Sequence, residues 1–170
     1  MHRVLVSLAA VAALAVPQAW AQLQCLGPAE RSVVEVAALR SQLMVLATGC
    51  HQDDSYNAFI RKYQADLMSN EKAVGELFRR KYGSRGQQEH DRFTTELANA
   101  ESNAGMRLGS DFCAHNGILF SEVMALRSPS ELMAYAAGKD LVPPSMEVCT
   151  EVAMAPAPTR NFAAAQTKHR

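Results

Sequence analysis

Several chemically capable residues lie in one short segment, which contains Asp111, Cys113 and His115. Asp111 and His115 are four positions apart, so on a helix they share one face. At that spacing a carboxylate can orient an imidazole, or the two side chains can bind one metal ion. No catalytic nucleophile accompanies them, so the pattern also fits an aspartate at a helix start and a partly exposed histidine beside a disulfide.

A second histidine, His51, directly follows Cys50. If Cys50 is bonded to Cys113, His51 and His115 come to the same end of the fold. Imidazole and carboxylate groups suit both Zn and Cu. The sequence therefore offers one candidate metal site, formed by His51, His115 and Asp111, with Asp53 or Asp54 as alternative carboxylate ligands, and we predict no other cofactor.

Four positive charges fall within seven residues, at Arg79, Arg80, Lys81 and Arg85. One interpretation is a surface that contacts anionic lipid, lipopolysaccharide or another polyanionic polymer of the cell envelope. The other is a solvated helix end, where cations complement the negative end of the helix dipole. The sequence leaves both open.

The N-terminus has the layout of a cleavable export signal. A short positive start precedes an apolar run at residues 4–16, and Ala19-Trp20-Ala21 supplies a small-residue cleavage site. The apolar run would span only about 20 Å as a helix, less than the roughly 30 Å of a membrane core. We therefore expect residues 1–21 to be a signal peptide, and a mature protein in the bacterial periplasm or secreted, which does not span the membrane.

The four cysteines, Cys25, Cys50, Cys113 and Cys149, would all remain after cleavage. An even number of cysteines in an exported chain predicts disulfides. No Cys-x-x-Cys occurs, which disfavours a thioredoxin-type centre, a zinc knuckle or an attached c-type haem. If two disulfides form, no cysteine is left as a catalytic thiol.

Charge and composition exclude some functions and set the size of the domain. The 170 residues carry 17 Lys and Arg against 17 Asp and Glu, with a pI near 7.0. This balance disfavours a nucleic-acid-binding protein, which needs a basic excess. From residue 150 onward the chain is rich in Ala and Pro with no periodic apolar pattern. We expect one helical domain at residues 22–149 and a disordered tail at residues 150–170.

Apolar residues recur at steps of three and four along four stretches, the spacing of one helix face. These stretches are residues 28–49, 54–82, 87–126 and 129–137. The second could break at Ser69, and the third should bend near Gly109, because an unbroken helix there would be about 60 Å long. Ser128 and Glu131 form a capping box around Pro129. With no strand-like alternation, the prediction is an all-α fold, a small antiparallel bundle of about four to five helices.

Helix direction favours one cysteine pairing among the three that are possible. If successive helices run antiparallel, Cys113 returns to the level of Cys50, and Cys149 returns to the level of Cys25. We therefore expect Cys50–Cys113 and Cys25–Cys149 disulfides.

The sequence lacks the glycine loops, nucleophile elbow, zinc-protease motif and EF-hand loop that signal common activities. Glu96 and Glu101 are five apart and make a poor glycosidase pair. The methionines do not cluster, and most are expected to fill gaps in the core. We therefore expect a binding or accessory protein, with an envelope protein or anionic envelope polymer as partner. The alternative is a carrier of a small ligand or of Zn or Cu, and an enzyme is the third choice.

Overall fold

The computed structural model describes residues 25–146 and 148–149. The expected signal peptide and tail lie outside these residues. Within them the chain is helical, and the only strand-like feature is an isolated parallel bridge between Leu26 and Val148. In chain order the helices are α1 (Pro28–Cys50), α2 (Asp53–Lys62), α3 (Gln64–Tyr82), the 3₁₀ helix η2 (Gly83–Arg85), α4 (Gly86–Leu108), α5 (Asp111–Asn116), α6 (Ile118–Ala125) and α7 (Pro129–Ala137).

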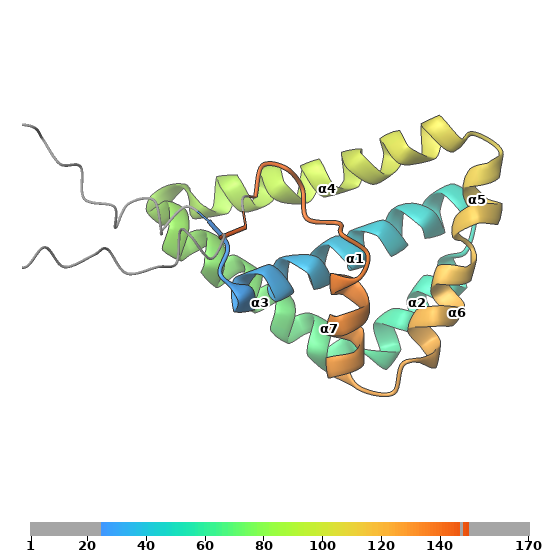
Figure 1. Ribbon diagram of the computed structural model, residues 1–170, viewed down its shortest axis with the longest axis horizontal. Helices are drawn as coiled ribbons and strands as arrows, with labels where there is room; N and C mark the ends of the chain where they lie inside the picture. Colours follow the sequence, from blue (N-terminus) through green and yellow to red (C-terminus); the bar gives the residue numbers. More distant parts are fainter. Residues whose placement is uncertain (1–24, 147, 150–170) are drawn as a thin grey trace, which may run out of the picture.

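Helix α1 is the centre of the fold, and α3, α4 and α7 all pack against it (Figure 1). Its leucines Leu39, Leu43 and Leu46 are completely buried. The C-terminal half of α1 forms one core cluster with α2, α6 and α7, and its N-terminal half forms another with α3 and α4. Within the described residues, α1 is also the one helix long and apolar enough to cross a membrane. Its packing here is that of a core helix.

The second predicted stretch divides at Tyr63, and α3 runs through Ser69 without a break. Tyr63 leaves helical geometry, with φ −109° and ψ 20°. Its ring is buried, and its hydroxyl donates to the carbonyl oxygens of Val123 and Leu126 at 2.9 and 3.1 Å. The break therefore lies where a buried tyrosine joins this segment to the end of α6. The possible break predicted at Ser69 does not occur.

The third predicted stretch bends where expected. Helix α4 ends at Leu108, Gly109 adopts a positive φ of 56°, and α5 begins at Asp111. Glycine tolerates this conformation, which other residues rarely adopt. A further break at Gly117 separates α5 from α6.

Helix α7 begins at the predicted capping signal. The Ser128 hydroxyl accepts the Glu131 amide at 3.2 Å. The Glu131 carboxylate reaches one residue further back than a standard capping box, and accepts the Arg127 amide at 2.6 Å. Both contacts fix the start of the helix.

The structure contains the two disulfides that the helix directions favoured, and the described residues include no free cysteine. Cys25 and Cys149 lie with their Cα atoms 4.9 Å apart, and Cys50 and Cys113 lie 5.6 Å apart. The first bond joins the two ends of the described chain. The second joins the end of α1 to α5.

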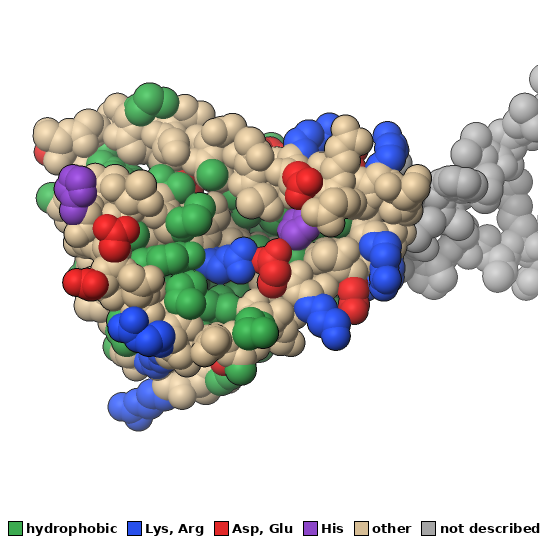
Figure 2. Space-filling model, turned by 180° about the vertical axis from the view of Figure 1, so that it is seen from behind, with side chains coloured by type: hydrophobic (Ala, Val, Ile, Leu, Met, Phe, Trp, Pro, Cys, Tyr) green, Lys and Arg blue, Asp and Glu red, His purple; other side chains and the backbone are tan. Residues whose placement is uncertain are grey.

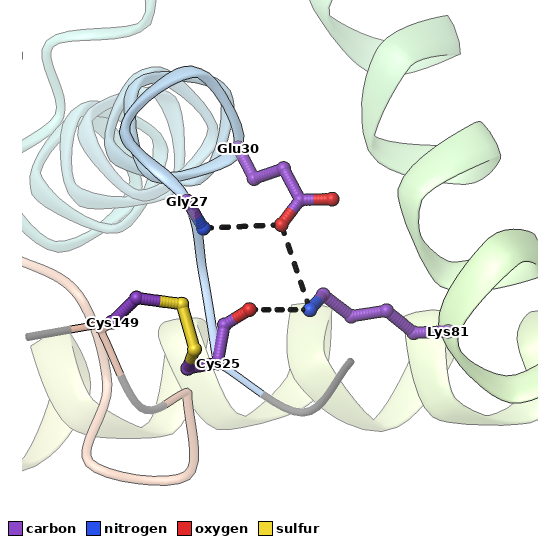
Figure 3. The surroundings of a disulfide bond; sticks show 5 residues. All are labelled: Cys25, Gly27, Glu30, Lys81 and Cys149. Carbon is purple, nitrogen blue, oxygen red and sulfur yellow. Dashed lines mark hydrogen bonds and ion pairs between the residues drawn. A yellow bond between two sulfur atoms is a disulfide. The ribbon is translucent and has the colours of Figure 1, made fainter. Parts of the chain in front are cut away.

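Lys81 ties the end of α3 to the Cys25–Cys149 disulfide (Figure 3). Its side chain is only 8% exposed, and its ammonium group donates to the Cys25 carbonyl at 2.7 Å and lies 3.5 Å from Glu30. Burial acts to raise the pKa of Glu30, but the Gly27 amide and the nearby cations more than offset it, so the pKa lies below its ordinary value. Glu30 thus remains ionised beside the buried Lys81.

Replacing Lys81 with methionine is expected to lower the free energy of unfolding by about 1.5 to 3 kcal/mol, because charged hydrogen bonds in a buried site are lost. Arg80→Met is the matched control. Arg80 also contacts Glu30, at 3.2 Å, but is 58% exposed, so its loss should cost at most about 1 kcal/mol. Urea unfolding measures both, and equal losses would contradict this role for Lys81. The Lys81 effect should shrink as pH falls and Glu30 becomes protonated.

Candidate functional site

The residues of the predicted metal site lie on the surface. His51 ends α1 in the left-handed conformation, with φ 55°, and His115 and Asp111 are exposed on α5. The Cys50–Cys113 bond does join the segments that carry the two histidines. In residues 25–146 and 148–149, however, no three His, Cys, Asp or Glu side chains gather in a group that could hold a metal ion. The expected His51, His115 and Asp111 set is therefore not assembled.

The predicted cationic cluster is divided by the fold. Lys81 is buried beside Cys25, and Arg80 contacts Glu30. Arg79 and Arg85 are exposed near the turn between α3 and α4. Lys81 therefore serves the fold, and an anionic partner for the exposed arginines stays a prediction.

The methionines contradict the expectation that most of them fill the core. Among the described methionines only Met146 is buried. Met68 is 66% exposed and Met106 is 74% exposed, and the remaining three are at least 38% exposed: Met44, Met124 and Met133. Methionine is flexible and polarisable, and proteins use it on surfaces that bind apolar partners. The helical spacing predicted helices correctly, but it did not tell which apolar positions a neighbour covers.

One apolar cavity, here called the Met68 cavity, has a volume of about 530 Å³ and lies between α1 and the α2–α3 segment. Its apolar walls include Ile60, Leu67 and Met68. Arg40 and Glu71 line it as well, and form an ion pair at 2.6 Å. The other carboxylate oxygen of Glu71 lies 3.5 Å from His90 of α4. This polar link connects α1, α3 and α4 at the edge of the cavity.

A second cavity of about 410 Å³, here called the Glu101 cavity, lies between α1, α4 and α5. It is lined mainly by apolar groups, and its lining residues include Met44, Val45, Thr48, Glu101, Gly105 and Phe112. Gly105 faces the Phe112 ring, and a Cβ at position 105 would lie 3.5 Å from it, in ordinary van der Waals contact. Glu101 is the one titratable side chain in this lining.

Glu101 lies in a setting that disfavours its charge. Burial raises the pKa of this carboxyl group, against the opposing effect of a hydrogen bond from the Gln42 amide. That bond is 3.3 Å long and engages one carboxylate oxygen, Oε2. Among the described residues, Glu101 has no ion-pair partner. The carbonyl oxygen of the Gln42 side chain is also buried without a hydrogen-bond partner in the described part of the chain.

The two cavities lie on neighbouring parts of α1. Arg40 lines one and Met44 lines the other, and these residues are one helical turn apart on the same face. Figure 2 shows hydrophobic side chains gathered in the hollowed middle of one face, beside a pair of oppositely charged side chains. Helix α7 lies on the opposite side of the molecule, in front of α1 in Figure 1. We call the surface formed by Arg40, Met44, Met68, Glu71 and Glu101 the groove face.

No protein-family model, curated protein or solved structure matches this chain. Functional inference therefore rests on the groove face itself.

Sequence reasoning missed the groove face for a physical reason. In the sequence, Glu101 stands out only beside Glu96, another acid on the same predicted helix. Its significance comes from Gln42 and Phe112, which are distant in sequence and belong to other helices. The signal that could have pointed to it is an acidic residue within a small-residue stretch, Ala100 to Gly105, where another helix can approach closely.

Proposed function

We propose that the protein is an exported binding module, accessory to an envelope protein, and that its groove face holds an apolar segment of that partner. The single observation that carries the proposal is a pair of apolar cavities, open to solvent, on one side of the buried helix α1, with exposed methionines at each. An exposed apolar surface of this kind typically marks an interaction site.

Two features favour a partner segment over an enclosed small ligand. The centre of the bundle is closed to solvent, since Leu39, Leu43 and Leu46 have no exposed surface. The cavities lie instead at the surface, whereas a carrier usually encloses most of its ligand. An apolar segment with side chains on one face could enter both cavities, as in the helix-in-groove mode of recognition.

Export is supported indirectly. The two disulfides are compatible with an oxidising compartment, and the apolar N-terminal run is typical of an export signal. The same proposal includes cleavage after residue 21, a periplasmic or secreted location and a disordered tail. It also includes an antiparallel bundle that forms one domain at residues 22–149.

The test is site-specific photo-crosslinking in cells that make the protein. A benzoylphenylalanine at position 68 should form an adduct of one defined mass, because Met68 is exposed at the rim of a cavity. The same probe at position 133 is the control, since Met133 is exposed on α7. In the position-68 probe protein, Met44→Asp should remove the adduct by placing a charge in the groove, and Met133→Asp should not.

Two results would count against the proposal. One is equal adduct formation from positions 68 and 133, which would indicate nonspecific contact. The other is an adduct at position 68 that Met44→Asp leaves unchanged while the protein remains folded by circular dichroism.

A further inference from the structure

The Glu101 cavity combines an apolar lining with a carboxylate that has no cationic partner among the residues that the structure describes. The cavity is lined by the side chains of Met44, Val45 and Phe112, and its polar end carries Glu101. Placing a carboxylate in an apolar cavity costs free energy unless a donor or a cation compensates for the lost water. Gln42 provides one hydrogen bond to it, at 3.3 Å. Residues 25–146 and 148–149 therefore supply no positive partner for this carboxylate.

We propose that the Glu101 cavity is a subsite for a primary ammonium group on an apolar chain, supplied by a lysine of the bound partner segment. This inference rests on the proposed function, and it names the chemistry of the segment that binds. A lysine side chain has an apolar four-carbon stem and a charged head. The stem would lie against Met44, Val45 and Phe112, and the head would reach Glu101.

The geometry at Glu101 favours lysine over arginine. Oxygen Oε2 already accepts the Gln42 amide, so a bidentate guanidinium would have to share that oxygen with Gln42. An ammonium group acts as a point charge and needs only one free oxygen. The neighbouring Phe112 ring also lines the cavity, and an aromatic face attracts a cation.

Glu71, the other acidic residue of the groove face, is not available to bind a cation from a partner. Glu71 already pairs with Arg40 at 2.6 Å and lies 3.5 Å from His90. The Met68 cavity is therefore expected to bind apolar side chains of the partner. The Glu101 cavity is expected to bind a positively charged side chain. A partner segment would then carry one lysine among apolar residues.

The chemistry can be tested on the purified protein with phenylbutylamine as the probe. Its uncharged analogue phenylbutanol has the same apolar body, so a comparison isolates the ammonium group. Titration followed by NMR should show phenylbutylamine binding about ten- to one-hundredfold more tightly than phenylbutanol, the range for a charge-assisted hydrogen bond. Shifts should occur at Phe112 and Gly105, which line the cavity.

Glu101→Gln should remove this preference while phenylbutanol still binds. Asp91→Asn is the matched control, because Asp91 is an exposed acid on the same helix and its carboxylate accepts from Gln87 four residues earlier. The control should bind within twofold of the original protein. Affinity for the amine should also rise with pH through the titration of Glu101, because only the ionised carboxylate attracts ammonium, and Glu101→Gln should lose this dependence.

The photo-crosslink at position 68 separates failure of this inference from failure of the proposed function. If the inference is correct, Glu101→Gln also weakens the adduct. If Glu101→Gln changes neither amine binding nor the adduct, the lysine subsite is wrong and the binding module stands. If the amine preference is present but no adduct forms at position 68, the assignment to a partner lysine is overturned and the cavity binds a free amine. Equal binding of phenylbutylamine and phenylbutanol overturns the inference directly.

Discussion

Replacing Cys25 and Cys149 together with alanine is expected to lower the free energy of unfolding by about 4 to 5 kcal/mol, as an upper value. The bond joins residues 124 positions apart, so its loss greatly increases the freedom of the unfolded chain. The native chain also loses the anchor beside Leu26, which is 1% exposed and pairs with Val148. Since domains of this size are stable by about 5 to 15 kcal/mol, a large part of the stability depends on this bond.

Equilibrium unfolding in urea measures the loss. Cys50→Ala with Cys113→Ala is the matched comparison, because it opens a loop of 63 positions and should cost about 4 kcal/mol in the same model. Its local effects should differ, since α5 contains no buried residue. Hydrogen exchange should therefore increase at α5 in this variant and near Leu26 in the first. A change below about 1 kcal/mol in either variant would contradict a stabilising role for that bond.

Phe78→Ala is expected to cost about 3 to 5 kcal/mol, the usual range for removing a buried phenylalanine. Phe78 is 2% exposed, and its ring lies 5.2 Å from Phe93 and 5.4 Å from His90, measured between ring centroids. It therefore joins α3 to α4 close to the turn between them. Thermal unfolding followed by circular dichroism gives the loss, expected as a shift of the midpoint by many degrees.

Phe112→Ala removes the same side chain from a different setting. Phe112 is only partly buried and lines the open Glu101 cavity. It should cost less than half as much stability as Phe78→Ala, because less contact with the protein is lost. It should instead weaken binding of phenylbutylamine. A greater loss of stability from Phe112→Ala than from Phe78→Ala would contradict the assignment of Phe78 to the core and of Phe112 to an open cavity.

Much of the fold could be predicted because its signals are local. Pro28 at a helix start, the glycine at 109 and the Ser128 cap act through the backbone of a few neighbouring residues. The cysteine pairing followed from helix lengths and directions, which the apolar periodicity predicts well. The break at Tyr63 was missed because it depends on a hydrogen bond to Val123, which lies 60 positions away.

The candidate site could not be predicted in the same way. An apolar stripe shows which side of a helix avoids water, but not whether a neighbouring helix covers it along its whole length. Met68 follows the buried Leu67 and lies at the edge of such a stripe, where it lines an open cavity. Lys81 is the opposite case. It belongs to a cationic run in the sequence, yet its side chain is buried and donates a hydrogen bond to the Cys25 carbonyl. Both outcomes depend on tertiary contacts between distant segments.

The two disulfides are nested, because the bond between Cys50 and Cys113 lies wholly within the loop closed by Cys25 and Cys149. Cys50 is bonded to the next cysteine along the chain, Cys113, whereas Cys25 is bonded to the last of the four, Cys149. A chain delivered N-terminus first into an oxidising compartment presents Cys25 and Cys50 before either native partner. Correct maturation then requires the thiols to stay reduced until α4 and α5 have emerged, or a Cys25–Cys50 bond to be exchanged later by thiol–disulfide attack.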